Sequence, residues 1–392
     1  MTSRIYMDNA ATSWPKRTTA VQAAMQFLTD CGATAGRGSY GSARRADEWL
    51  AQARRLLAGL IGATSSHCIA MGSSGTHVLN AALLGLLQNG DHVISTQAEH
   101  NSVLRPLQML KQSRGIQVDF VPCDEVGWVD VQRASKCLRP NTRWIVVGHA
   151  SNVTGAVQDL SAWSMMAKQC GARLIVDASQ TLGYLPIDVQ EMGIDVLATA
   201  GHKGLQALPG TGLLYLCSDL HPQLEPLMTG GTGVLSELID GGCDWPMSVE
   251  VGNLNLPGVI SMAVAASELQ SEWSQGKTDN WRIAVQRLRS GLHSMPGVRV
   301  LGQPALSAQQ TSTDWIGVVS VLVDGWDVHE LAIVLDSAYG IEARSGLHCA
   351  ALIHDALGSR QSGGTLRLSP GHHTTIQEVD LVLTALAEIV GA

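Results

Sequence analysis

A lysine and an aspartate stand at the ends of two apolar runs of this sequence, where a folded chain could bring them together. Lys203 follows the run 194–198 within Ala-Thr-Ala-Gly-His-Lys-Gly, and Asp177 ends the run Arg-Leu-Ile-Val-Asp. A lysine amine can hold an aldehyde as a Schiff base, and a carboxylate can keep a pyridine nitrogen protonated. Together they indicate pyridoxal 5'-phosphate. Taken singly, each residue also fits a solvated loop lysine or the cap of a following helix.

Other polar segments follow predicted strands of the same region. The segment 72–77 precedes an apolar helical run, so its free N–H groups and the Thr76 hydroxyl could hold a phosphate, although an ordinary helix cap fits as well. His100 could stack on a pyridine ring and transfer protons, or be merely structural. Asn152 could bond the phenolic oxygen of the cofactor or the substrate carboxylate, or form a turn, and Gln180 could bond the same oxygen.

A cysteine and two arginines near the carboxyl end indicate how a substrate could be bound and attacked. Cys349 lies in a polar loop, where Arg344, His348 and a following helix terminus could lower the pKa of its thiol. Buried, inert cysteines are the commoner case. Arg367, in the strand-like run 364–369, could clamp an amino-acid carboxylate through two hydrogen bonds.

The composition limits the class of protein. A chain of 392 residues exceeds what one core serves, so we expect a large and a small domain. Hydrophobic residues make up 45% and charged residues 15%, which fits a soluble enzyme that buries surface against a second subunit. The formal charge of -8 and the lack of basic clusters argue against nucleic acid as a partner.

The cysteines and the apolar runs favour a cytoplasmic protein. The eight cysteines form no C-x-x-C pair and the amino terminus carries no charged-then-apolar signal, so we expect a reducing compartment. The longest apolar stretch, 81–87, is too short to cross a bilayer, and no membrane insertion is expected. His372 and His373 are adjacent, so their side chains point apart, and no metal site is expected.

The order of apolar runs and helical patterns predicts an α/β fold with a largely parallel sheet, whose ligands lie at the carboxyl ends of the strands. The predicted strands are 92–95, 117–121, 143–147, 173–177, 196–199 and 212–216, with helices at 17–28, 43–60, 103–113, 130–138 and 160–169. A smaller α+β domain follows, with strand-like runs at 317–323 and 340–344 and a closing helix at 376–390. We expect a large domain over 13–262 and a small domain over 263–392 that also includes residues 1–12.

Several segments resemble, in chain order, the class V aminotransferase superfamily, and within it most closely the cysteine desulfurases. They are residues 6–15, 98–101, 151–155, 176–180, 201–204, 230–233, 251–255, 344–350 and 365–371. The resemblance implies a fold-type I pyridoxal phosphate enzyme with a mainly parallel seven-stranded sheet in its large domain, acting as a homodimer. It implies removal of sulfur from L-cysteine, giving L-alanine and an enzyme persulfide.

The resemblance also implies roles for the cofactor-site residues. Lys203 would form the Schiff base, Asp177 would pair with the pyridine nitrogen and His100 would stack on the ring. Gln180 and Asn152 would bond the ring oxygen.

The phosphate would be held by residues of two loops, namely Gly75, Thr76 and His202, and Asn253 would reach the active site of the second subunit. Many relatives carry threonines where Gly75 and Asn253 stand, and a serine where Ala200 stands. We therefore expect the backbone to hold the phosphate more, and hydroxyl groups to hold it less, than in those relatives.

The substrate would be held by Arg367, with Asn152 and Arg344, and Cys349 would attack its sulfur. Selenocysteine lysis, C–S β-elimination and epimerisation are alternatives on the same scaffold, and Cys349 favours desulfuration because elimination needs no thiol nucleophile. A non-catalytic sulfur-transfer scaffold is disfavoured by the intact lysine, aspartate and arginine. The sequence leaves open whether selenocysteine is preferred and whether an acceptor protein takes the sulfur.

Overall fold

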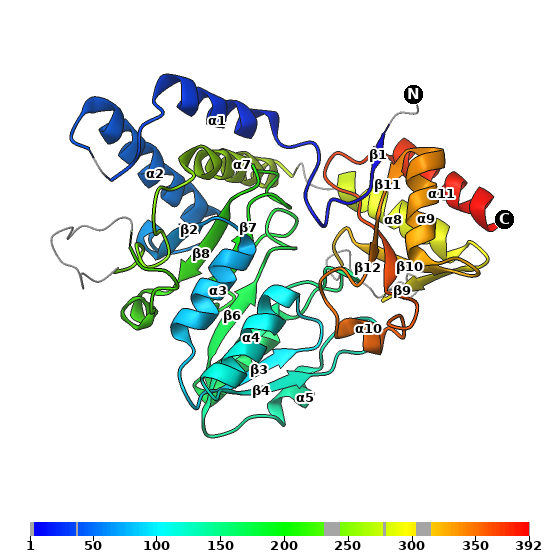
Figure 1. The fold of residues 1–392 in the computed structure, drawn as a ribbon, viewed down its shortest axis with the longest axis horizontal. Coiled ribbons are helices and arrows are strands. Elements are labelled where there is room, and N and C mark those ends of the chain that lie inside the picture. Colours follow the sequence, from blue (N-terminus) through cyan, green and yellow to red (C-terminus); the bar gives the residue numbers. More distant parts are fainter. Residues whose placement is uncertain (1–3, 37, 231–243, 277–279, 303–314, 392) are drawn as a thin grey trace.

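Seven strands form the central sheet of the computed structural model, which describes residues 4–36, 38–230, 244–276, 280–302 and 315–391 (Figure 1). In sheet order they are β2 (Ile69–Gly72), β8 (Gly212–Leu216), β7 (Val196–Ala200), β6 (Arg173–Asp177), β5 (Thr142–Gly148), β3 (His92–Thr96) and β4 (Gln117–Val121). Neighbours from β7 to β4 are parallel, whereas β8 runs antiparallel to β2 and β7. The predicted mainly parallel seven-stranded sheet is confirmed.

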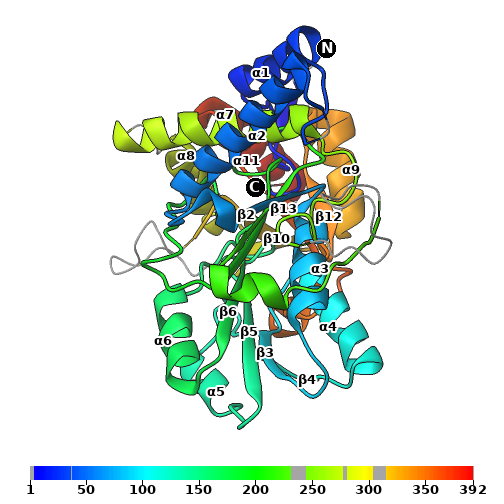
Figure 2. The same cartoon turned by 90° about the vertical axis from the view of Figure 1, so that its left-hand side faces the viewer.

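Helices cover both faces of this sheet, because alternate side chains of each strand point to opposite faces. Leu213 and Tyr215 of β8 face one hydrophobic cluster, and Leu214 and Leu216 face another. Figure 2 shows α5 and α6 on one side of the sheet and α3 and α4 on the other. The first cluster includes α1 (Thr18–Asp30), α2 (Gly41–Leu60), α5 (Val131–Ser135), α6 (Leu160–Cys170) and α7 (Leu256–Ser274), and the second includes α3 (Gly75–Leu86) and α4 (Asn101–Ser113).

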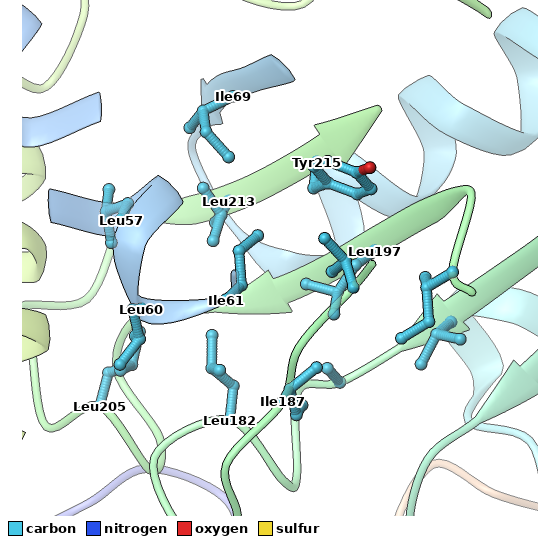
Figure 3. Packing of buried hydrophobic residues seen from close by; sticks show 14 of the residues in the cluster. Leu57, Leu60, Ile61, Ile69, Leu182, Ile187, Leu197, Leu205, Leu213 and Tyr215 are labelled. Carbon is cyan, nitrogen blue, oxygen red and sulfur yellow. The ribbon is translucent and has the colours of Figure 1, made fainter. Parts of the chain in front are cut away.

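The carboxyl end of α2 packs against β7 and β8 in the core of the large sheet. Figure 3 shows Leu57 near Leu213 of β8, and Ile61 between Leu213 and Leu197 of β7, and all four side chains are fully buried. Burying one such side chain contributes about 1.5–3 kcal/mol. This packing holds β7, whose carboxyl end leads directly into the turn that carries Lys203.

Helix α5 is shorter than the sequence pattern predicted. The pattern predicted a helix over 130–138, whereas the structure places it at Val131–Ser135, capped by the Asp130 side chain, which accepts from the Gln132 N–H. After Ser135 the N–H groups of Lys136, Cys137 and Leu138 bond to carbonyls three residues back instead of four, so the α-helix ends in a tighter turn. The predicted strand over 340–344 is divided, since β11 (Ile341–Glu342) and β12 (Arg344–Gly346) pair with different strands.

The remaining elements form a smaller sheet with its own helices. The sheet order is β12, β13 (Thr365–Leu368), β10 (Val319–Val323) and β9 (Val298–Leu301), all antiparallel. Its helices are α8 (Asn280–His293), α9 (Val328–Tyr339), α10 (Ile353–Ala356) and α11 (Ile376–Val390), and two 3-10 helices, Ser66–Cys68 and Ser218–Gln223, lie in the larger part. The amino-terminal strand β1 (Ile5–Tyr6) pairs with β11, and Ile5, Met7 and Ala10 join the hydrophobic cluster of the small sheet.

Residue 262, the expected end of the large domain, is followed by further residues of the large core. That position lies inside α7, and Met262, Ala266 and Leu269 on the same helix all belong to the core of the large sheet. The helix packs along α1 and α2 over its length, so the large core extends to its end. In the described part of the chain, no helix is long and apolar enough to cross a bilayer.

Candidate active site

A cavity of about 590 Å³, counting its open mouth, lies at the carboxyl ends of β5, β6 and β7 and beside the amino termini of α3 and α4. Its wall brings together the predicted Gly75, Thr76, His100, Asn152, Asp177, Gln180, His202 and Lys203, with Ser74, Ala98, Ser102, Gly148, Ala150, Ser179 and Ala200. Parallel strands place these residues together because their carboxyl ends meet at one edge of the sheet.

Asp177 and Lys203 form the charged centre of the cavity. Asp177 ends β6, is almost fully buried, and accepts the N–H of Ser179 at 2.9 Å, which fixes its carboxylate. Burial lowers the pKa of Lys203, while the negative charge of Asp177 opposes this shift. A larger fraction of the amine is therefore neutral near pH 7 than for a solvated lysine.

His100 caps α4 and is held in one tautomer by its hydrogen bonds. Its Nδ1 accepts the N–H of Ser102 at 3.1 Å and lies 2.7 Å from the Ser102 hydroxyl. Burial, with a smaller effect of the Lys203 charge, lowers the pKa of His100 to about 4. The ring is therefore neutral near pH 7, and its proton lies on Nε2 because Nδ1 acts as an acceptor.

The start of α3 has the properties of a phosphate cradle. Ser74 caps the helix by accepting the His77 N–H at 3.0 Å. The N–H groups of Gly75 and Thr76 have no hydrogen-bond partner among the described residues, and both residues line the cavity. A Cβ on Gly75 would lie 3.1 Å from the Ser179 hydroxyl, so the absence of a side chain keeps this corner open. Unpaired N–H groups at a helix amino terminus attract anions.

His202 closes the same side of the cavity. Its Nδ1 lies 3.0 Å from the Thr12 hydroxyl, and the amine of Lys16 donates to its carbonyl at 2.6 Å. Burial is the main cause that lowers the pKa of His202 to about 4 and that of Lys16 to about 8. The neutral ring can donate a hydrogen bond to an anion without adding charge.

Cys349 lies in an exposed loop that is tied to the cavity wall. Its Sγ accepts from Nη2 of Arg344 at 3.4 Å, and its carbonyl accepts the N–H of Asn101 at 2.7 Å. Cys349 and His348 both have left-handed backbone, with φ of 58° and 50°, which costs energy in residues other than glycine. The hydrogen bond from the Asn152 amide to the His348 carbonyl, at 2.6 Å, helps to hold this conformation.

The expectation that a helix amino terminus acts on Cys349 is wrong. Helix α10 begins only at Ile353 and has four residues, and a turn separates it from the cysteine. Glycine and polar residues in the loop looked like a helix start, but His348 and Cys349 adopt left-handed backbone that no helix can contain. Arg344 is therefore the cation in contact with the sulfur.

Arg367 is almost fully buried beside the cavity. Its Nη1 donates to the carbonyl of Asn152 at 3.0 Å, and its Nη2 donates to Oδ1 of Asp8 at 2.6 Å. The amide nitrogen of Asn152 is bonded to His348, and that of Gln180 is bonded to the Ala10 carbonyl at 3.1 Å. The amide nitrogens of Asn152 and Gln180 thus each donate a hydrogen bond to a backbone carbonyl.

Some predicted residues lie outside the cavity wall. Cys349, Arg344 and Arg367 approach it from the small sheet, and their charges act on the pKa of Lys203. Asn253 is exposed on the segment before α7 and does not line the cavity. Residues 231–233 of the glycine-rich loop lie outside the described residues.

Asp8, Lys16 and Glu99 were not predicted as site residues. Glu99 is buried directly before His100, and burial raises its pKa to about 8. Asp8 and Glu99 stand inside two of the segments that carry the family resemblance, so the sequence did contain a signal for them. Arg367, the partner of Asp8, lies 359 positions along the chain, and no local pattern reveals that contact.

The family model described as Aminotransferase class-V matches residues 5–382, a span that contains both sheets and every residue of the cavity wall. The chain belongs to the class V aminotransferase family. The probable cysteine desulfurase of Methanothermobacter thermautotrophicus is 33% identical to this chain, and the match covers 99% of this chain and 95% of the relative. Cysteine desulfurase CsdA of Escherichia coli is 30% identical, and the match covers 97% of this chain and 93% of the relative.

A solved structure of a class V relative has the same fold. The apo structure of a cysteine desulfurase from Thermococcus onnurineus superposes with a TM-score of 0.90 at 29% sequence identity, covering 99% of this chain and 95% of that one. The fold is thus shared along nearly the whole length of both chains.

Proposed function

We propose that this protein is a pyridoxal 5'-phosphate-dependent cysteine desulfurase, which converts L-cysteine to L-alanine and leaves the sulfur on Cys349. The observation that carries the proposal is an exposed thiol, 3.4 Å from the Arg344 guanidinium, on a loop bonded to the wall of a cavity that contains Lys203 and Asp177. Relatives that cover nearly the whole chain bear the name cysteine desulfurase.

The residues of the cavity fit pyridoxal 5'-phosphate. The unpaired N–H groups at the start of α3, with Thr76 and His202, suit its phosphate, Asp177 suits its pyridine nitrogen and Lys203 suits its aldehyde. When bound, the cofactor supplies an electron-accepting ring that makes the α-proton of an amino acid removable. Gly75 and Ala200 leave space where relatives carry larger side chains, so here backbone groups hold more of the phosphate.

Lys203 moves a proton, while Asp177 and His100 supply charge and a hydrogen bond. Because burial lowers the pKa of Lys203, its amine can accept the α-proton of the substrate near neutral pH. Asp177, fixed by the Ser179 N–H, keeps a negative charge beside the ring nitrogen. His100 is neutral with its proton on Nε2, so it can donate a hydrogen bond on the side of the cavity where α4 begins.

Arg367 and Cys349 act on the two ends of the substrate. The Arg367 guanidinium binds the carboxylate, and it is placed for this by the Asn152 carbonyl and by Asp8. Cys349 reacts as a thiolate that Arg344 stabilises, and its sulfur forms a bond with the substrate sulfur. The carbon–sulfur bond breaks, its electron pair stays with the carbon, and proton uptake gives alanine.

The active unit is a homodimer. Asn253 is exposed and outside the cavity wall of its own chain, which suits a residue that contacts the cavity of a partner. Large apolar side chains are exposed on several elements, among them Met25, Leu28 and Tyr40, and an interface would cover such surfaces.

A product assay tests the proposal. The purified protein, loaded with the cofactor, is supplied with L-cysteine, cystine or selenocysteine, and alanine and pyruvate are both quantified. Desulfuration gives alanine in equal amount to the sulfur released. Pyruvate and ammonia in place of alanine would assign β-elimination, and turnover of selenocysteine alone would assign a selenocysteine lyase.

A further inference from the structure

We propose that Asp8 sets the affinity of the site for the substrate carboxylate, by orienting the Arg367 guanidinium and by weakening its positive charge. This inference rests on the proposed role of Arg367 in binding an amino-acid carboxylate. Asp8 is then a positioning and specificity-determining residue. It does not react with the substrate.

The contacts of Arg367 show why its orientation depends on Asp8. The side chain is 1% exposed, and its Nη1 and Nη2 donate to the Asn152 carbonyl and to Asp8 Oδ1 at 3.0 and 2.6 Å. Its Nε is buried without a hydrogen-bond partner in the described part of the chain. Two fixed acceptors therefore define the plane of the guanidinium, and donor groups remain for a further carboxylate.

The charge of Asp8 acts against a second carboxylate. The Asp8 side chain is 22% exposed, whereas its partner is 1% exposed, so the ion pair is open toward solvent on the carboxylate side. A substrate carboxylate on the same guanidinium lies within a few ångströms of Asp8, and two like charges at that separation repel. Burial is the main cause that lowers the pKa of Arg367, Asp8 opposes this shift, and the positive charge of nearby Arg344 adds to it.

The main chain around Asp8 is held without its side chain. The Asp8 carbonyl accepts the Tyr6 hydroxyl at 3.2 Å and the Ala11 N–H at 3.1 Å, and its backbone bridges to Ser369. Replacing the carboxylate by a neutral amide keeps an oxygen for Arg367 and leaves these bonds intact. Asp8→Asn therefore removes charge alone, and Asp8→Ala removes both charge and orientation.

The test compares these two variants with wild type as cofactor-loaded enzymes. We expect Asp8→Asn to lower KM for L-cysteine about threefold to tenfold with kcat nearly unchanged, and Asp8→Ala to raise KM by at least about tenfold. The dissociation constant of L-alanine, measured by calorimetry, should move in the same directions. Cysteamine, which lacks the carboxylate, should bind all three proteins equally.

Glu342→Gln is the matched control. Glu342 lies on the strand that pairs with β1 and makes an equally short ion pair, 2.6 Å to Arg4, but the side chains of Arg4 and Glu342 are 45% and 36% exposed. It should leave KM and L-alanine binding unchanged. A rise of KM in Asp8→Asn, or no change in either Asp8 variant, would overturn the proposal. If wild type forms no alanine from cysteine, the proposed function fails, yet calorimetry with L-alanine still decides the role of Asp8.

Discussion

The buried carboxyl group of Glu99 should make the stability of the protein fall as pH rises toward 8. The Glu99 residue is 1% exposed, and its Oε1 accepts the Thr96 hydroxyl at 2.6 Å and the Gly148 N–H at 3.0 Å. Its Oε2 is buried with no partner in the described part of the chain. Burial, with a smaller contribution from the charge of Asp177, raises the pKa of Glu99 from 4.5 to about 8.

The size of the effect follows from this pKa. The folded protein keeps a proton on Glu99 that the unfolded chain releases, so the contribution is fully present below pH 4.5 and is lost as pH rises to about 8. At about 1.36 kcal/mol for each pH unit, the complete loss is on the order of 5 kcal/mol. Between pH 6 and pH 8 the loss is about 2.3 kcal/mol, because the folded protein itself begins to release the proton near pH 8.

Glu99→Gln isolates the contribution of Glu99 to the pH dependence of stability. The amide keeps an oxygen for the Thr96 hydroxyl and the Gly148 N–H but does not titrate. The free energy of unfolding of the variant therefore lacks the pH dependence that Glu99 causes. The free energy of unfolding in urea, measured for wild type and variant at pH 6, 7 and 8, should shift in favour of the variant by about 2.3 kcal/mol over that range. Other titrating groups cancel in the difference. Exposed Glu125→Gln serves as control, and a difference for Glu99→Gln that does not change with pH would refute the reasoning.

Two further predictions concern the cofactor and the assembly. Borohydride should fix the cofactor covalently to the wild-type chain and not to Lys203→Ala, as measured by mass spectrometry, and covalent fixation in the variant would show that another amine is the attachment site. Sedimentation at micromolar concentration should show a homodimer, and a fully active monomer would contradict a shared active site. We expect the dimer interface to bury more than about 2,000 Å² in total.

The large sheet was predictable because its signals are local. Short apolar runs ending in polar residues gave the strands, and the rule that ligands lie at the carboxyl ends of parallel strands placed Asp177, Lys203 and His100 together. Local signals also misled in places. The segment up to Leu138 suggested a longer α5, although residues 136–138 form a tighter turn, and a glycine-bearing loop suggested a helix next to Cys349.

The rest of the site depends on contacts between distant parts of the chain. The ion pair of Asp8 and Arg367 joins residues 359 positions apart, and the hydrogen bond from Asn152 to His348 spans 196 positions. Neither contact leaves a periodic pattern in the sequence. The raised pKa of Glu99 likewise follows from burial that only the packing of β3 against β5 creates.

Trapping sulfur on Cys349 tests the central claim most directly. Brief reaction of the cofactor-loaded protein with L-cysteine, followed by thiol alkylation and mass spectrometry of peptides, should find one extra sulfur on the peptide that contains Cys349. Cys349→Ala should keep the bound cofactor but lose alanine formation by more than about a hundredfold. Cys31→Ala, which removes a cysteine bonded at 3.2 Å to the Ser42 carbonyl, should react like wild type. Undiminished alanine formation by Cys349→Ala, or extra sulfur only on other cysteines, would contradict the proposed mechanism.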